Sequence, residues 1–215
     1  MDGSVFDEDY YEHGIESGKS LYQNYRWMPE ATMSMAMAII DYLHIRPRDS
    51  VFEIGCAKGY LIKALHLLHR KSACGVDISP YAIDNIDPAV EGSCWLIRRA
   101  DDMVRGSSGL DFDMCIAKDV FEHIEEDEIG SYLHCVPAKR IFVCVPLGDG
   151  DNGFRAKPNN LDVTHVTCKP EQWWHQKFES YGWRVYTFTF RVDGIKESYY
   201  KRYPEGHGFF VLDKI

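Results

Sequence analysis

Hydrophobic residues recur along this chain in two patterns that alternate from residue 51 onward. Stretches such as Gly59–His69 place leucines on one face of a helix, whereas short continuous apolar runs are typical of buried strands. Strands that alternate with helices predict βαβ units and a parallel sheet, and so an α/β fold. The strands predicted in this way are Val51–Ile54, Ala73–Asp77, Cys94–Arg98, Phe112–Ala117, Arg140–Val145, Arg184–Val192 and Gly208–Leu212.

The chain ahead of these strands has a different pattern. Residues 1–28 are polar and rich in tyrosine, and Gly14 and Gly18 interrupt any helix, so we expect an irregular lead-in or a lid. Pro29 suits a first helical position, and apolar residues then recur at helical spacing until Pro47, which predicts a helix capping the sheet. The residues that define its predicted apolar face are Met33, Met37 and Ile40.

The segments between the later strands are predicted as follows. A helix after the fourth strand is expected to carry Val120, Ile124 and the acidic run Glu125–Glu128. A loop rich in Gly, Asp and Asn follows over residues 147–168, a length that is typical of functional loops. The next helix is predicted over Pro170–Tyr181.

Charge and cysteine content limit the classes of function. The 215 residues include 24 Lys and Arg against 33 Asp and Glu, a net charge of −9, so the chain lacks the positive field that dominates affinity for nucleic acid. The seven cysteines are scattered through apolar runs, as is typical of reduced core residues in an intracellular protein. The first residues lack signal-peptide features, and no apolar run reaches the roughly 20 residues of a membrane span. We expect a cytoplasmic protein without membrane contact.

A glycine-containing turn follows the first strand directly. Gly55 permits a close approach of the backbone to a ligand because it has no Cβ. The dinucleotide fingerprint G-x-G-x-x-G is incomplete, because Ala57 and Tyr60 stand at its second and third glycine positions. This disfavours a pyrophosphate, and the preceding Glu53 favours a ligand with a positively charged amino group. S-adenosylmethionine has both an amino group and a sulfonium, and it has no phosphate.

Further carboxylates follow the second and third strands. Asp77 lies about 20 residues after Gly55, the separation at which a carboxylate holds ribose hydroxyls. Asp101 and Asp102 follow the third strand, where a carboxylate accepts from an adenine amino group. Since open α/β sheets bind ligands at the carboxyl ends of their strands, these acids are expected at one site.

These stretches together resemble a known family, the class I, Rossmann-like S-adenosylmethionine-dependent methyltransferases of small-molecule type. The resemblance covers about residues 48–190, and Ala57 departs from the glycine that is usual there. The stretches that resemble the family's motifs, in chain order, are Val51–Gly59, Gly75–Ser79, Ala100–Asp101, Asp119–Ile124, Asp162–Val166 and Trp173–Trp174.

The resemblance implies a doubly wound, mostly parallel seven-stranded sheet whose last strand inserts antiparallel beside the fifth. Residues 1–47 would form the lead-in or lid with the capping helix, and residues 48–215 the S-adenosylmethionine-binding domain. The cofactor would be S-adenosylmethionine and the product S-adenosylhomocysteine. The predicted cofactor-binding residues are Glu53, Gly55, Cys56, Ala57, Gly59, Asp77, Ile78, Asp101, Asp102 and Lys118.

Methyl transfer from a sulfonium is an in-line displacement, so alignment supplies much of the catalysis, and a base is needed only where the acceptor must lose a proton. We predict His165 and His123 as catalytic residues. Asp119 and Glu122 are interpreted as acids capping the first turn of the helix after the fourth strand.

Substrate and lid residues are predicted in the aromatic lead-in, at Tyr11, Tyr22, Tyr25 and Arg26. No metal is predicted, because the His and Cys residues do not recur at zinc spacing. A divalent ion at Asp149, Asp151 and Asp162 is the alternative, but such a cluster is also ordinary turn chemistry.

The predicted function is methyl transfer to a small-molecule acceptor, either a metabolite or a nucleotide-linked sugar. The alternatives are a non-catalytic S-adenosylmethionine-binding subunit, a protein or RNA methyltransferase and, less favoured, an NAD-dependent oxidoreductase. Ala117–Val120 stands where base amino-methylating enzymes have an Asn/Asp-Pro-Pro-aromatic signature, which disfavours that branch. A non-catalytic subunit would retain Glu53, Gly55 and Asp77 but would tolerate loss of the candidate base.

Overall fold

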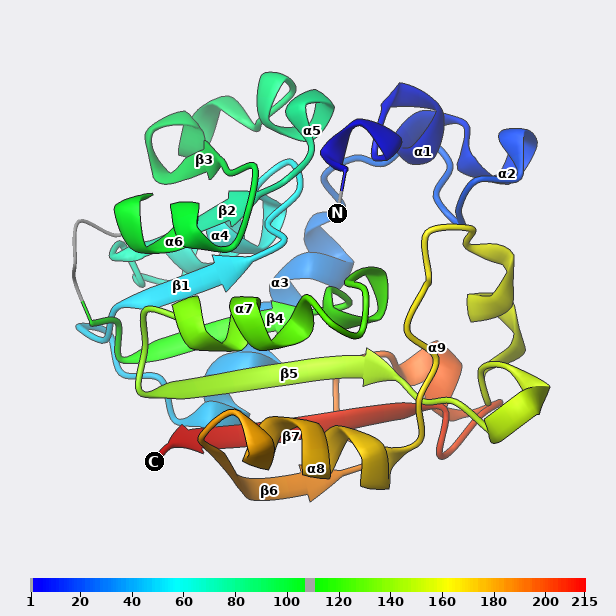
Figure 1. The fold of residues 1–215 in the computed structure, drawn as a ribbon. Coiled ribbons are helices and arrows are strands. Elements are labelled where there is room, and N and C mark those ends of the chain that lie inside the picture. Colours follow the sequence, from blue (N-terminus) through cyan, green and yellow to red (C-terminus); the bar gives the residue numbers. More distant parts are fainter. Residues whose placement is uncertain (1, 107–110) are drawn as a thin grey trace.

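A computed structural model describes residues 2–106 and 111–215 of the chain. Within these ranges one sheet has seven strands in the order β3-β2-β1-β4-β5-β7-β6 (Figure 1). The first five strands pair in parallel, and β7 runs antiparallel between β5 and β6. The predicted doubly wound, mostly parallel sheet is therefore confirmed. The strands are β1 Val51–Ile54, β2 Ala73–Asp77, β3 Cys94–Leu96, β4 Met114–Lys118, β5 Arg140–Pro146, β6 Trp183–Thr189 and β7 His207–Lys214.

Helices cover both faces of the sheet. Figure 1 shows α6, α7 and α8 in front of it and α3 and α4 behind it. The alternation of side chains along β5 produces the two cores, since Ile141, Val143 and Val145 pack on the front face and Phe142 and Cys144 on the back. The helices are α1 Glu8–Glu12, α2 Gly14–Ser17, α3 Pro29–Leu43, α4 Tyr60–Leu67, α5 Pro80–Asp84, α6 Asp101–Gly106, α7 Ile129–Cys135, α8 Glu171–Ser180 and α9 Glu197–Tyr200.

The apolar face predicted for the capping helix is only partly correct. Helix α3 begins at Pro29 as expected, but Met37 is 53% exposed. The residues of α3 that are buried in the core behind the sheet are Ala36, Ile39 and Leu43. Small and branched residues let α3 approach its neighbours more closely than a face of methionines would, and the methionines lie at its margins.

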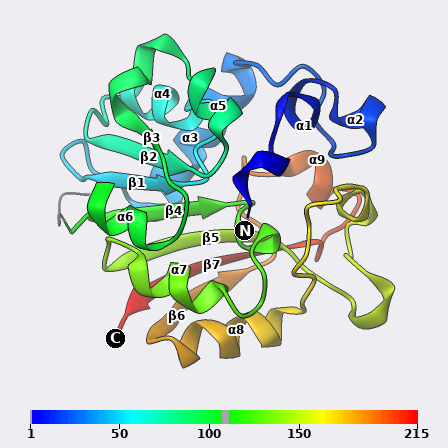
Figure 2. The ribbon, with the colours of Figure 1, turned by 45° about the horizontal axis from the view of Figure 1, so that its top comes forward.

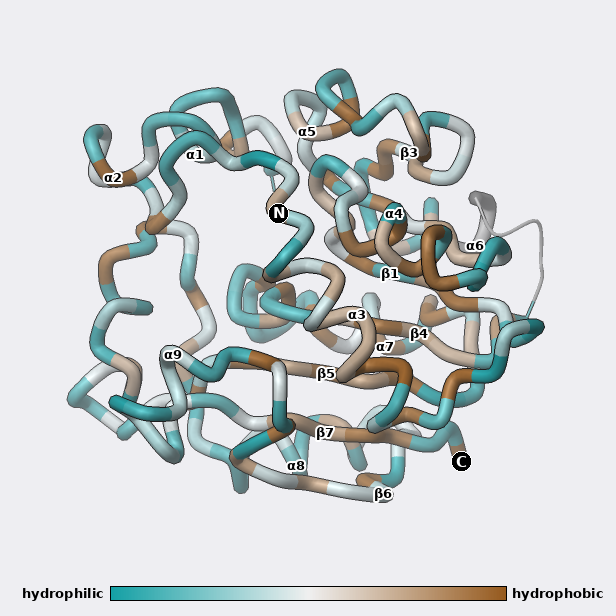
Figure 3. The backbone as a smooth tube through the Cα atoms, turned by 180° about the vertical axis from the view of Figure 1, so that it is seen from behind, coloured by the Kyte–Doolittle hydropathy of each residue, from teal (hydrophilic) through white to brown (hydrophobic). Residues whose placement is uncertain are grey.

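The lead-in is more regular than its glycines suggested. Gly14 begins α2, and Gly18 ends it in the left-handed conformation, φ 70°. Asp7 accepts a hydrogen bond from the Tyr10 amide and so caps α1. In Figure 3 this segment is mostly hydrophilic, in contrast to the strands. No helix of the described residues is long and apolar enough to cross a bilayer.

The helix predicted across Val120–Glu128 is wrong. A single 3-10 turn covers Phe121–His123, Ile124 is extended, and α7 begins only at Ile129. The cause lies in a distant segment: the Glu122 carbonyl accepts from the amides of Val166 and Thr167, both at 2.9 Å. That carbonyl is therefore not used for an α-helical bond, and the loop after β5 is fastened to this turn.

Candidate functional site

A cavity of about 460 Å³ opens at the carboxyl ends of β1, β2 and β4. Open α/β sheets bind ligands at this edge, where the strand order reverses. The N-terminal segment forms the opposite wall. Of the predicted site residues, those that line the cavity are Glu53, Gly55, Cys56, Ala57, Asp77, Ile78, Lys118, His123, Tyr11, Tyr22, Tyr25 and Arg26.

Asp77 fixes the conformation of the loop after β1. Its carboxylate accepts from the Ala57 amide at 2.7 Å and from the Ser79 amide at 2.8 Å. Ala57 is held at φ 47°, a left-handed conformation that costs a non-glycine residue roughly 1–2 kcal/mol. Burial raises the pKa of Asp77 above its usual value, although these amide hydrogen bonds act in the opposite direction. The turn is thus preorganised by a carboxylate that also faces the cavity.

Glu53 has a buried carboxylate oxygen without a partner among the described residues. It is 6% exposed, and its Oε2 has no hydrogen-bond partner in the part of the chain that the structure describes. Burial raises the pKa of Glu53 well above its usual value, and the nearby Asp77 adds to this. A buried carboxylate without a partner costs free energy that a bound cation would recover.

Gly55 leaves no room for a side chain. Its φ is 76°, and a Cβ at this position would lie 2.6 Å from Val120 Cγ2. We expect Gly55→Ala to lower the free energy of unfolding by about 2 kcal/mol, from backbone strain and overpacking together. In a Val120→Ala background only the strain remains, and the cost should fall to about 1 kcal/mol. Urea denaturation of the four proteins measures both values, and equal costs in the two backgrounds would contradict the packing argument.

The acids after the third strand do not line the cavity. Asp101 is exposed and accepts from Cys135 Sγ at 3.5 Å, and Asp102 accepts from the Arg98 amide at 3.0 Å. Strand β3 ends at Leu96, two residues earlier than predicted, and Ile97 lines the cavity there. Together with Ile78 and Tyr132 it gives this end of the cavity an apolar wall, of which the sequence analysis predicted Ile78 but not Ile97 or Tyr132.

Gly59 also lies outside the cavity lining. It precedes α4 in the left-handed conformation, φ 77°, and a Cβ there would meet Val90 Cγ2 at 2.7 Å. The structure therefore gives Gly59 a conformational and packing role.

The N-terminal segment runs between α5 and the loop after β5 (Figure 2), and it forms hydrogen bonds to both sides. The Phe6 carbonyl accepts from Ser79 Oγ at 2.6 Å, and Tyr10 donates its hydroxyl hydrogen to Asp162 Oδ2 at 3.0 Å. The lid tyrosines pack on one another, with the rings of Tyr22 and Tyr25 4.9 Å apart. This segment therefore forms a fixed wall that joins the second strand to the loop after β5.

A buried ion-pair cluster lies at the end of β4. Asp119 Oδ2 accepts from Lys118 Nζ at 2.5 Å and from Lys196 Nζ at 2.8 Å. Burial alone would raise the pKa of Asp119, but the two ammonium groups hold it well below its usual value. Lys196 comes from the insertion between β6 and β7, and no local sequence signal identified it.

The interpretation of Asp119 and Glu122 as helix caps is wrong. Asp119 is in the left-handed conformation, φ 58°, and no α-helix follows it directly. Glu122 is 1% exposed, and burial raises the pKa of its carboxyl well above the usual value. Both side chains point into the protein, beside the predicted catalytic histidines.

The two predicted catalytic residues, His123 and His165, are neighbours in the structure. Their ring centroids are 4.6 Å apart, and His123 lines the cavity while His165 lies behind it. Burial lowers the pKa of His123 to about 4, and it also lowers the pKa of His165. Burial therefore favours the neutral form of both imidazoles.

Comparison with known proteins gives a clear result for the fold. No protein-family model and no curated protein sequence matches the chain. Solved structures do match: a complex of the Haloferax volcanii Trm112 methyltransferase activator with a protein described as a methyltransferase shows 15% identity over 87% of this chain and 92% of that chain, with a TM-score of 0.63.

An S-adenosylmethionine-dependent methyltransferase from Archaeoglobus fulgidus shows 13% identity over 84% of this chain and 92% of that chain, with a TM-score of 0.62. Geranyl diphosphate C-methyltransferase from Streptomyces coelicolor, in complex with Mg²⁺, geranyl diphosphate and S-adenosylhomocysteine, shows 11% identity over 85% of this chain and 77% of that chain, with a TM-score of 0.61. The chain therefore has the Rossmann-like fold that these methyltransferases share, as the sequence motifs implied.

Proposed function

We propose that this protein transfers a methyl group from S-adenosylmethionine to a small-molecule acceptor and releases S-adenosylhomocysteine. The observation that carries the proposal is the unpaired, buried Glu53 carboxylate, which lines the cavity together with Gly55 and Asp77. A dinucleotide would bring a pyrophosphate to this negatively charged edge, whereas S-adenosylmethionine brings an ammonium group and a sulfonium.

Each part of the cofactor has a counterpart in the cavity. We assign the ammonium group to Glu53, whose Oε2 has no partner among the described residues. We assign the two ribose hydroxyls to Asp77, because each of its carboxylate oxygens accepts one amide hydrogen bond here and can accept another. We assign the adenine ring to the apolar wall of Ile78, Ile97 and Tyr132. Ring packing would replace the carboxylate contact expected from Asp101 and Asp102.

The acceptor is assigned to the part of the cavity between His123 and the N-terminal segment. Tyr22, Tyr25 and Arg26 line that part, so an aromatic wall would exclude water and hold the acceptor in line with the methyl group. The bound cofactor supplies the methyl group, and the chain's own residues position the acceptor. A cavity of about 460 Å³ that also holds the cofactor suits a small molecule and not a folded macromolecule.

Two neighbouring structures support the acceptor class and a third supports a different arrangement. A mitomycin 7-O-methyltransferase and the geranyl diphosphate enzyme are named for small acceptors. The Haloferax structure contains an activator protein, which favours, as a second candidate, a methyltransferase or a non-catalytic subunit that works in a protein complex. The buried Glu122 and the half-buried His123 and His165 beside the cavity favour a catalytic chain.

Calorimetry on the purified chain tests the proposed cofactor. S-adenosylmethionine and S-adenosylhomocysteine should each bind with a stoichiometry of one, and NAD should show no heat of binding at the same concentrations. S-adenosylhomocysteine retains the ammonium group, ribose and adenine, so we expect its affinity to be similar. Binding of NAD in preference to the adenosyl ligands would overturn the proposal.

A further inference from the structure

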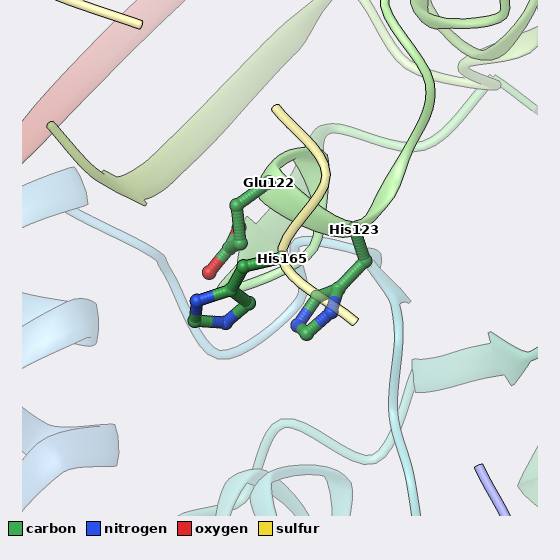
Figure 4. A group of neighbouring side chains, drawn as sticks. All are labelled: Glu122, His123 and His165. Atoms are coloured by element: carbon green, nitrogen blue, oxygen red, sulfur yellow. The ribbon is translucent and has the colours of Figure 1, made fainter. Parts of the chain in front are cut away.

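Three side chains with metal-binding atoms meet beside the cavity (Figure 4). Each of Glu122, His123 and His165 offers one ligand atom, and these atoms all lie within 4.8 Å of one another. Figure 4 shows the carboxylate and the two imidazole rings turned toward a common space. Glu122 and His123 come from the turn after β4, and His165 comes from the loop after β5.

Hydrogen bonds fix the proton positions on both imidazoles. His165 Nδ1 lies 2.8 Å from the Asn159 carbonyl, which can only accept, so this nitrogen carries the proton. Thr164 Oγ1 donates to Asp162 Oδ1 at 2.6 Å and therefore accepts from His123 Nδ1 at 2.8 Å. These hydrogen bonds place the single proton of the neutral ring on Nδ1 in both histidines, so each Nε2 is the nitrogen with a lone pair for a ligand. A partner on the far ring nitrogen is the usual arrangement for histidines that bind metals.

The carboxylate completes the set. Glu122 is 1% exposed, and its Oε2 has no hydrogen-bond partner among residues 2–106 and 111–215. A carboxylate buried in this way requires a cation or a proton. Nearby charges also favour a cation, because three acids, Asp119, Glu122 and Asp162, outnumber the two ammonium groups of Lys118 and Lys196.

The backbone holds the two contributing segments in register. The Glu122 carbonyl accepts from the Val166 and Thr167 amides, and Thr167 Oγ1 donates to the Ile124 carbonyl at 2.6 Å. These bonds join the turn that carries Glu122 and His123 to the segment that follows His165. The two segments with the ligand atoms are thus fixed to each other. Modest side-chain rotations would bring the ligand atoms to metal–ligand distances.

We propose that Glu122, His123 and His165 form a binding site for a divalent first-row transition ion. Two imidazoles and one carboxylate are a ligand set that suits Mn²⁺, Fe²⁺, Co²⁺ or Zn²⁺, whereas Mg²⁺ and Ca²⁺ prefer ligand sets made of oxygen. Three protein ligands leave coordination positions open. No metal-binding motif is recognisable in the sequence, because His165 is distant from Glu122 and His123 along the chain.

Of the three proposed ligands, His123 lines the acceptor part of the cavity, so an ion at this site would lie at the edge of that part. This step rests on the proposed function: the ion would bind and acidify a hydroxyl of the acceptor. The hydroxyl proton leaves to solvent, the oxygen forms a bond to the methyl carbon, and the carbon–sulfur bond breaks to leave a neutral thioether. The acceptor class is therefore an alcohol or phenol.

Cobalt binding tests the site without any acceptor. Chelator-treated protein titrated with Co²⁺ should develop visible d–d absorption at one ion per chain, without the sulfur-to-cobalt charge-transfer band of a thiol site. Glu122→Gln and His165→Ala should weaken Co²⁺ binding by at least about 10- to 100-fold, the loss that even an outer-shell change causes. Thr164→Val, which removes the acceptor for His123 Nδ1, should weaken binding within the same approximate 10- to 100-fold range.

Matched controls separate this proposal from the proposed function. His134→Ala and Glu125→Gln alter exposed residues and should leave Co²⁺ binding unchanged. Asp77→Ala should retain Co²⁺ binding, and His165→Ala should retain S-adenosylmethionine binding, with the melting temperature of each variant reporting that it is folded. Absence of Co²⁺ binding, a thiol band alone, or equal affinity in wild type, Glu122→Gln and His165→Ala would overturn the metal site and leave the cofactor assignment standing.

Discussion

Replacing Asp77 with alanine is expected to weaken S-adenosylmethionine binding on the order of 10³-fold. The carboxylate has two roles at the cavity edge: it accepts from the Ala57 and Ser79 amides, and it is the acceptor assigned to the ribose hydroxyls. Hydrogen bonds to a charged group contribute about 1.5–3 kcal/mol each, so losing two ribose contacts costs roughly two to four decades of affinity. Calorimetry with wild type and variant measures the ratio.

The same substitution should also reduce stability, because the two amides lose their acceptor inside the protein. A buried donor left unsatisfied costs about 1–3 kcal/mol, which urea denaturation of the ligand-free protein would detect. Asp84→Ala, at an exposed position of α5, is the matched control and should change neither quantity. An affinity for S-adenosylmethionine within twofold of wild type in Asp77→Ala would remove Asp77 from the cofactor site.

Local patterns were sufficient to predict the sheet and the loop after β1. Buried strands require continuous apolar runs, and a turn such as Gly55 to Gly59 requires residues that adopt the left-handed conformation. Both features can therefore be recognised from a few consecutive residues. The same holds for Asp77, whose distance from the turn follows from one βαβ unit. These features depend on neighbours in sequence.

The features that could not be predicted depend on contacts between distant segments. The helix expected over Val120–Glu128 does not form because the loop after β5 uses the Glu122 carbonyl. Lys196 pairs with Asp119 across the sheet edge, and nothing near either residue in sequence indicates it. The adenine contact was predicted at Asp101 and Asp102, but β3 ends at Leu96, and Ile97 lines the cavity in place of these acids.

Glu53→Gln is expected to stabilise the ligand-free protein and to weaken the complex. At pH 8 the wild type must either bury an unpaired charge or hold a proton that the unfolded chain releases, and the variant does neither, so the free energy of unfolding should rise by about 1–3 kcal/mol. The affinity for S-adenosylmethionine should fall about 10²-fold. The ammonium group loses a hydrogen bond to a charged acceptor, which contributes about 1.5–3 kcal/mol to binding. A residue that opposes stability and supports binding is characteristic of a ligand site.

The pH dependence gives this prediction a second test. The folded-state pKa of Glu53 is raised above its unfolded value of about 4.3, so the folded protein binds a proton more tightly than the unfolded chain does. At pH 4 the carboxyl is mostly protonated in the folded state, and wild type and variant should have similar stability. As the pH rises above the unfolded pKa, the wild type must either keep that proton or bury a charge, and it should lose stability relative to the variant until the folded pKa is passed. Urea denaturation between pH 4 and pH 8 measures this difference, with the exposed Glu91→Gln as a control. A difference that does not change with pH would mean that Glu53 is paired in the folded protein, and an unchanged affinity would place the ammonium group elsewhere.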